Sequence, residues 1–288
     1  MARERVEVRP IQDDDALAVA TFLHQNLNPG VAADVWLSLL SPPWQADAPN
    51  HGFQLVTASG IVGAYVAVYS DREIGGQTRR LCNLAAFCVL TDYRADSLRL
   101  VRAVLRQPGL EFTDLSPSGN VVALNERLGF VHLDTATRIA PNLPALPRKG
   151  VRVTSDPARV AGGLQGHDVA IHRDHRDAPA ARHILVSDGD AYAYLIVRKD
   201  RRKNLPLFAT PLYVGGDAVV LRRNWRLVAS HLLVRHRIPV TLAERRTLGF
   251  APRLGVDQAV PRPKMFRSEH LSARDIDYLY SELTLLEW

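Results

Sequence analysis

The chain has 288 residues, of which 47% are hydrophobic and 23% are charged, and its formal net charge is +6. This composition is typical of a globular protein of about two domains, and it excludes an intrinsically disordered chain, a collagen and a coiled coil. Two cysteines, Cys82 and Cys88, can build neither a disulfide framework nor a thiolate zinc cage, which favours a reducing cytoplasm.

The N-terminal residues carry charges where an export signal would need an apolar stretch. The longest apolar run, Ile61 to Tyr69, has about half of the roughly 20 residues that a membrane-spanning helix needs. We therefore expect no export signal and no transmembrane segment. The positive charge is nearly all arginine, but acidic residues are interspersed with it, and this pattern argues against a general nucleic-acid binder.

The first half of the chain alternates predicted strands and helices. A strand over Val6–Ile11 precedes a helix that Asp13–Asp15 caps, because acidic residues stabilise the positive end of a helix. The later predicted helices lie over 32–40, 98–105 and 120–128. The later predicted strands lie over 53–58, 61–70, 78–90, 111–115 and 130–137. This order predicts an α/β fold of the α+β type, with a mixed sheet packed against a central helix.

Prolines and glycines are concentrated between Pro141 and Gly163, where hydrophobic periodicity is weak. Such a composition is typical of a linker. We therefore expect one domain over residues 1–140, a linker over 141–163 and a second domain over 164–288.

The second half repeats the element order of the first in reduced form. Its predicted elements are a hairpin, a strand, a helix and a strand, over 183–198, 207–214, 221–232 and 239–242. Leu248-Gly249-Phe250 then repeats Leu128-Gly129-Phe130. We interpret the chain as two tandem units, the second a shortened copy.

The C-terminal stretch is predicted to be an amphipathic helix. Ser272 and Asp275 form a capping box, and apolar residues follow it at helical spacing. Packing into a core is the favoured role of this helix, and a homodimer interface or docking onto the first domain is the alternative.

The most informative segment runs from Phe87 to Leu100, where a strand turns into a helix through Tyr93-Arg94. Such a turn directs backbone N–H groups and the positive helix end to one spot, where a pyrophosphate can bind. Together with Asn125-Glu-Arg-Leu-Gly-Phe130, this segment resembles the GNAT superfamily of acyl-CoA-dependent N-acyltransferases. The resemblance covers roughly Val6 to Thr137.

The resemblance implies that acetyl-CoA or another acyl-CoA is the co-substrate, and that a small-molecule or protein amine accepts the acyl group. In this superfamily the fourth strand ends Val-x-Pro-x-Tyr-Arg and leads into Arg/Gln-x-x-Gly-x-Gly/Ala. Val89 and Tyr93-Arg94 match, whereas Thr91 replaces the proline and Ser97 and Arg99 replace two small residues. The residues that would hold the acyl-CoA are Phe87, Val89, Arg94, Ala95, Asp96, Ser97, Leu98, Arg99 and Asn125.

Two positions that carry acid–base chemistry in many members of the superfamily differ here. No carboxylate lies between Leu81 and Leu90, where many members have a glutamate base, and Asn83 is the polar side chain there. Asn125 stands where many have a tyrosine that protonates the thiolate, and an amide is not an acid. Asn83 and Asn125 are therefore the catalytic candidates, for a reaction that depends on positioning and on a carbonyl polarised by the Val89 N–H.

The missing groups also favour an alternative of another class, a catalytically inactive scaffold or interaction protein with the same fold. Elsewhere, His167–Asp177 gathers residues that can bind metals, but alternating charges in a polar segment are more typical of a solvated face, and we predict no metal site. Cys88 lies in an apolar strand, which predicts a buried, unreactive thiol.

Overall fold

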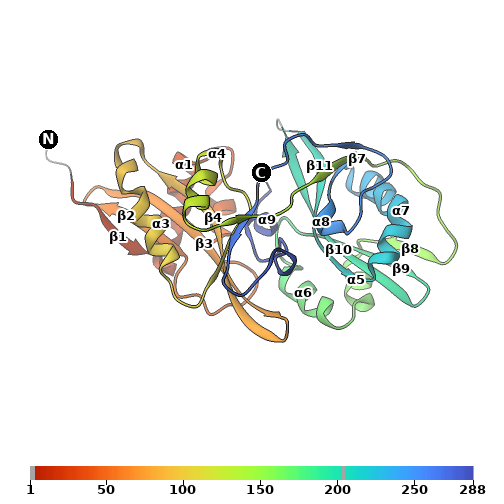
Figure 1. The fold of residues 1–288 in the computed structure, drawn as a ribbon. Helices are drawn as coiled ribbons and strands as arrows, with labels where there is room; N and C mark the ends of the chain where they lie inside the picture. The colour runs from red at the N-terminus through yellow and green to blue at the C-terminus, as the bar shows by residue number, and fades with distance from the viewer. Residues whose placement is uncertain (1–3, 203–204, 288) are drawn as a thin grey trace. The chain divides into compact units, whose positions relative to one another are not determined.

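A computed structural model describes residues 4–202 and 205–287, which divide into two compact units, each built on its own mixed sheet (Figure 1). Unit 1 runs to Leu133 and also contains Pro263–Ile276 and Tyr280–Leu286, whereas unit 2 consists chiefly of Asp134–Arg262. The predicted α/β class with a mixed sheet is confirmed. None of the helices in the described ranges combines the length and the apolar character of a membrane span.

The sheet of unit 1 has the order β1-β2-β3-β4-β5-β14-β6, in which β4 and β5 are parallel and every other pair is antiparallel. Its strands are β1 (Glu7–Pro10), β2 (Gly52–Thr57), β3 (Gly60–Ile74), β4 (Gln77–Val89), β5 (Glu111–Asp114), β6 (Val131–His132) and β14 (Met265–Arg267).

The helices of unit 1 include the predicted central helix, α3, which packs on β2 and β3 because its buried residues recur at helical spacing. The full set is η1 (Asp13–Asp15), α1 (Ala16–Asn26), α2 (Ala33–Leu37), η2 (Thr91–Asp96), α3 (Ser97–Leu105), α4 (Gly119–Arg127), η3 (Ala273–Asp275) and α9 (Glu282–Leu285).

The sheet of unit 2 has the order β13-β7-β12-β11-β10-β9-β8, with β11 and β12 parallel. Its strands are β7 (Thr137–Pro141), β8 (Val151–Thr154), β9 (Arg182–Asp188), β10 (Ala191–Arg202), β11 (Leu205–Gly216), β12 (Val240–Glu244) and β13 (Val256–Asp257). Its helices are α5 (Pro157–Gly163), α6 (His167–His175), α7 (Ala218–His236) and α8 (Arg245–Leu248).

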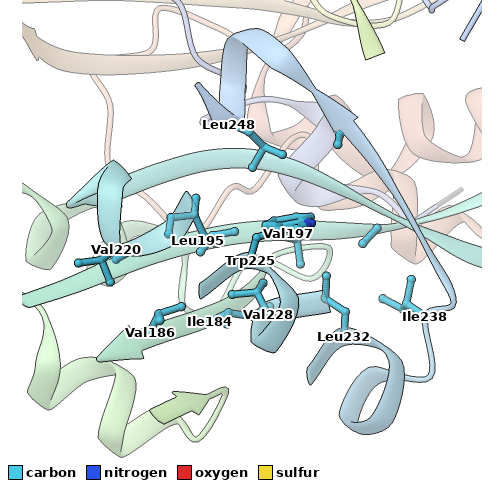
Figure 2. Packing of buried hydrophobic residues seen from close by; sticks show 14 residues of the cluster. Ile184, Val186, Leu195, Val197, Val220, Trp225, Val228, Leu232, Ile238 and Leu248 are labelled. Atoms are coloured by element: carbon cyan, nitrogen blue, oxygen red, sulfur yellow. The ribbon is translucent and has the colours of Figure 1, made fainter. Parts of the chain in front are cut away.

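The core of unit 2 lies between α7 and the central strands. Trp225, Val228 and Leu232 of the helix pack on Ile184 and Leu195 of the sheet, and all of these side chains are buried (Figure 2). Burying each such side chain contributes roughly 1.5–3 kcal/mol, so this contact holds the helix to the sheet.

The two sheets share one order of strand directions: three antiparallel pairs, one parallel pair, and two antiparallel pairs. In each, the strand beside the shorter parallel strand comes from a distant part of the chain, β14 in unit 1 and β7 in unit 2. A tandem repeat of one fold would produce this shared order. The second series differs in its shorter helix, α8 in place of α4.

Three predictions about chain organisation are wrong in detail. The predicted linker over 141–163 contains β8 and α5, which belong to unit 2, and residues 263–276 and 280–286 of the predicted second domain belong to unit 1. The predicted strand over 130–137 is split into β6 and β7, which lie in different sheets. Short strands take their pairing partners from distant segments, and local sequence does not reveal such partners.

The predicted long C-terminal helix is also wrong. The capping box of Ser272 and Asp275 is present, but the helix ends within one turn, and Ile276 has extended backbone angles. Tyr280 then adopts a left-handed φ of 54°, and only α9 is helical beyond it. The apolar residues of this stretch are buried as expected, but they lie on an irregular segment and not on one face of a helix. The predicted helix is therefore not available as a homodimer interface, and a homodimer stays a prediction.

Gly129 and Gly249 both end a helix with a left-handed backbone, with φ of 86° and 74°. Because a Cβ is strained there, we expect Gly249→Ala to lower the free energy of unfolding by about 1–2 kcal/mol in urea denaturation. The matched control is Gly119→Ala, where the helical backbone suits alanine and the Cβ would meet open space, so its stability should be unchanged or slightly higher. Equal effects of both changes would contradict this account.

Candidate active site

The parallel strands of unit 1 pair over a short distance and then separate. The pairs run from Leu81 with Glu111 to Asn83 with Thr113, and β4 then continues to Val89 beyond the end of β5. The carboxyl ends of both strands therefore lie on the same side of the sheet, where α/β sheets commonly bind ligands, and we call the region beyond the last residue pair the opening.

One edge of β4 directs backbone donors toward this opening. The Leu90 N–H donates to the Val62 carbonyl of β3 at 2.9 Å. Successive residues of a strand direct their N–H groups to opposite edges, so the N–H of Val89 points to the side on which β5 lies. This is the donor that the sequence assigned to an acyl carbonyl. The Phe87 side chain instead packs on Tyr65, with ring centroids 4.8 Å apart.

The turn after β4 is tighter than the predicted pyrophosphate loop. Residues 91–96 form the 3-10 helix η2, so the Tyr93 N–H is bound to the Leu90 carbonyl and the Ser97 N–H to the Arg94 carbonyl. Those two donors are used within the turn. Arg94, Ala95 and Leu98 are exposed on its surface.

Arg99 does not lie over this turn as an extra phosphate ligand. Its guanidinium donates to the Asp96 carboxylate at 2.9 Å and to the Val6 carbonyl at 3.0 Å. The arginine is therefore bound to a carboxylate of the turn itself and to the backbone just before β1 at Val6, within unit 1. Arg94 is the arginine on which the phosphate prediction now depends.

A buried carboxyl group lies at the end of β5. Asp114 is 4% exposed, and its carboxylate accepts hydrogen bonds from Asn125 Nδ2 at 2.8 Å and from the Ser116 N–H. Burial raises the pKa of Asp114 to about 6, although the two hydrogen bonds act in the opposite direction. A carboxylate with this pKa is ionised at neutral pH and can accept a proton.

The two predicted catalytic asparagines lie on opposite faces of the sheet. Asn125 contacts Asp114, whereas Asn83 donates from Nδ2 to Thr113 Oγ1 at 3.1 Å. Successive strand residues point to opposite faces, so the structure does not bring Asn83 and Asn125 into one cluster.

Asp114, Cys82 and Glu282 all lie close enough to Tyr65 to act on its hydroxyl. Burial, and then the charge of Asp114, raise the pKa of Tyr65 well above its ordinary value. Burial likewise raises the pKa of the Cys82 thiol. Tyr65 and Cys82 therefore stay neutral at physiological pH, whereas the charge of Asp114 changes near pH 6. Cys88 is buried and its pKa is raised, as predicted for an unreactive thiol.

Two carboxylates lie at the corresponding turn of unit 2, between β11 and α7. Asp217 caps α7 by accepting the Val219 N–H, which places a negative charge at the helix end. Asp168 of α6 occupies the space beside Gly215, where a Cβ would lie 2.0 Å from its Oδ1. This turn does not suit an anion.

The expectation that His167–Asp177 forms a solvated face is wrong for two of its residues. Asp168 is buried and accepts hydrogen bonds from Tyr192 at 2.7 Å and Tyr213 at 2.8 Å, and His175 is fully buried. These contacts tie α6 to the sheet. Within the described ranges, no three histidine, cysteine or acidic side chains are grouped to hold a metal ion.

Comparison with solved structures shows which fold this is. The GCN5-related glucosamine N-acetyltransferase region of a fungal multi-domain GH3 β-N-acetylglucosaminidase has a TM-score of 0.61 at 14% identity, over 92% of this chain and 38% of that one. GCN5-related N-acetyltransferases from Anabaena variabilis and Kribbella flavida have TM-scores of 0.57 and 0.54 at 13% and 16% identity. They match 91% of this chain, and 72% and 71% of their own chains. The chain has the fold of the GCN5-related N-acetyltransferases.

The similarity is one of fold. No family profile matches the chain, and no curated protein sequence matches it. The resemblance seen in Val89, Tyr93 and Arg94 is thus confirmed for the architecture of the chain.

Sequence reasoning missed Asp114, because it looked for a carboxylate only along β4. A usable signal was present: Asp114 closes a short strand that follows an amphipathic helix, as expected for the strand parallel to β4. The rule that carboxyl ends of parallel strands meet at one edge could have placed it in the site.

The pKa of Asp114 makes a prediction about stability. Because its pKa is raised from 3.8 to about 6 on folding, the stability contributed by its proton is complete below about pH 4 and is lost as pH rises through 6. Asp114→Asn cannot ionise, so we expect it to gain stability relative to the wild type between pH 4 and 7.5, by up to about 3 kcal/mol. Urea denaturation at both pH values measures this, with the exposed Asp92→Asn as control. Parallel pH profiles of Asp114→Asn and wild type would refute the assignment.

Proposed function

We propose that unit 1 is an acyl-CoA-dependent N-acyltransferase that transfers an acetyl group from acetyl-CoA to a primary amine. The observation that supports this most directly is the pair of groups on the two parallel strands. The Val89 N–H points to the β5 side of β4, and β5 ends at a buried carboxylate, Asp114, whose pKa is raised to about 6. A polarising donor and a base on neighbouring strands are groups that amine acylation uses.

The reaction begins with the acceptor, which is an ammonium ion at neutral pH. Asp114 takes one proton from it, directly or through water, and the neutral amine then attacks the thioester carbonyl carbon. The new C–N bond forms, the oxygen charge is stabilised by the Val89 N–H, and the C–S bond breaks. The second amine proton passes to the leaving thiolate, giving the amide, CoA as its thiol, and one proton left on Asp114.

Asn125 has a supporting part in this scheme. It cannot protonate a thiolate, but its Nδ2 donates to the Asp114 carboxylate at 2.8 Å and holds it at the end of β5. The acyl-CoA phosphates are assigned to the turn over 94–99, with Arg94 as the cation and α3 beginning at Ser97. We assign the reaction to the cytoplasm, where both cysteines would stay reduced.

We assign no acyl-CoA site to unit 2, which we interpret as a second copy of the fold. Its turn carries Asp217 at the helix end and Asp168 beside Gly215, and both charges oppose phosphate binding.

A non-catalytic scaffold is the second candidate function. The ion pair between Arg99 and Asp96 favours it, because Asp96 places a carboxylate at the turn to which the phosphates are assigned. The two candidates differ in whether acyl transfer occurs: the enzyme must bind acetyl-CoA, and the scaffold functions with or without it.

Binding of acetyl-CoA is the first test. At 100 times its dissociation constant, a bound ligand should stabilise the folded protein by about 2.7 kcal/mol in a thermal-shift titration. Arg94→Ala should weaken binding about tenfold, because one charge-assisted hydrogen bond is lost. Arg106→Ala, an exposed arginine at the other end of α3, is the control and should bind like the wild type. Absence of any shift with acetyl-CoA would favour the scaffold.

Loss of the base is the second test. With glucosamine, spermidine and an unblocked peptide as trial acceptors, release of the CoA thiol measures transfer. We expect Asp114→Asn to lower kcat by about 10²–10⁴, and wild-type kcat/KM to fall as the pH is lowered below about 6. The control Asp92→Asn should retain activity. Full activity in Asp114→Asn would remove Asp114 from the mechanism.

A further inference from the structure

The end of the chain returns to unit 1 and lies beside the separated strands. We call Tyr280–Leu286 the C-terminal segment. All seven of its residues are buried, and Ser281, Glu282 and Thr284 are fully so. A fully buried polar side chain lowers the stability of the fold unless it is hydrogen-bonded. The hydrogen-bond partners of these residues therefore indicate the role of the segment.

Glu282 binds both strands at the point where they separate. Its backbone N–H donates to Asn83 Oδ1 at 3.3 Å, and its carboxylate accepts from Ser116 Oγ at 2.6 Å. Asn83 itself belongs to the last residue pair of β4 with β5. Glu282 thus links β4 to the first residues after β5.

Ser116 connects this contact to the proposed base. Its hydroxyl is bound by Glu282, and its own N–H donates to the Asp114 carboxylate. The order of contacts is therefore Glu282, Ser116, Asp114. The hydrogen bond from the Ser116 hydroxyl to Glu282 restrains the residue whose backbone N–H in turn restrains Asp114.

The segment is held firmly enough to act as a fixed support. The Ser38 hydroxyl shares its proton between the Val35 carbonyl at 2.7 Å and the Leu285 carbonyl at 3.3 Å. The ring of Trp44 lies 5.2 Å from that of Tyr280, and the Arg72 guanidinium stacks 5.1 Å from the same ring. The loop containing Trp44 and the strand β3 thus fix the segment from two sides within unit 1.

We propose that Glu282 is a positioning residue for Asp114: by holding Ser116, it keeps the Ser116 N–H directed at the base. This inference rests on the proposed function, because it gives Asp114 the role of base. It makes the C-terminal segment a part of the unit 1 site, although unit 2 lies between them in the sequence.

Removal of the Glu282 carboxylate would free the Ser116 hydroxyl and loosen the turn after β5. The N–H bond that favours the charged form of Asp114 would weaken, and Asp114 would keep its proton to higher pH. The titratable groups facing this site from β3, β4 and α9 are Tyr65, Cys82 and Glu282. Tyr65 and Cys82 stay neutral, so they do not mask the titration.

The test is a ¹³C NMR titration of the Asp114 carboxyl in the full-length protein, with Asp114→Asn identifying its signal. Both Glu282→Ala and Glu282→Gln lack the carboxylate, but the glutamine keeps an oxygen that accepts from Ser116. We therefore expect the midpoint in Glu282→Ala to lie about one pH unit above that in Glu282→Gln, as loss of one hydrogen bond to a carboxylate would cause. Glu269→Ala, an exposed glutamate earlier in the same stretch, is the control and should leave the midpoint unchanged.

Equal midpoints in folded Glu282→Ala and Glu282→Gln would overturn the inference, because the hydrogen bond from Ser116 would then have no effect on Asp114. If Glu282→Ala does not fold, Ser116→Ala tests the same link: an upward midpoint supports it and an unchanged midpoint overturns it. The titration needs no acyl transfer. An inactive protein with the expected midpoints would therefore contradict the proposed function and leave the positioning role in place.

Discussion

The early end of the β4–β5 pairing is the constraint on which the rest of unit 1 depends. Parallel strands that stop pairing at Asn83 and Thr113 leave backbone and side-chain polar groups that must find other partners. Asn125 and the C-terminal segment supply those partners on the two faces of the sheet. The Val89 N–H on the β5 side of β4 and the Asp114 carboxylate at the end of β5 are the groups to which we assign the chemistry of the proposed site.

The local parts of this arrangement could be predicted from sequence. The sequence of residues 78–105 predicts a strand, a turn and a helix, because the spacing of its apolar residues changes from every second residue to helical spacing. Gly129 predicts the end of a helix, because glycine adopts the left-handed backbone angle there without strain. The partners across the chain could not be predicted. β14 has three residues, too few to show a hydrophobic periodicity, and its place in the sheet is set by its pairing with the edge of β5. The apolar spacing of the C-terminal stretch suited a helix and an irregular buried chain equally.

The two units show how one fold can carry different chemistry. Both have a short parallel pair, Leu81–Asn83 with β5 and Phe208–Ala209 with β12. In unit 2 the turn that follows is closed by Asp217 at the start of α7 and by Asp168 against Gly215. Each unit has a buried carboxylate at the end of the shorter parallel strand, Asp114 of β5 and Glu244 of β12. The two turns are therefore the difference on which our assignment of catalysis to unit 1 rests.

The central claim is that acetyl-CoA occupies the opening between β4 and β5. A crystal structure of the protein with acetyl-CoA tests it most directly. The account predicts the thioester oxygen within hydrogen-bonding distance of the Val89 N–H, with the acetyl group facing Asp114 and the diphosphate at the turn near Arg94. Acetyl-CoA bound elsewhere on the chain, or an opening that stays closed by side chains at saturating acetyl-CoA, would contradict it.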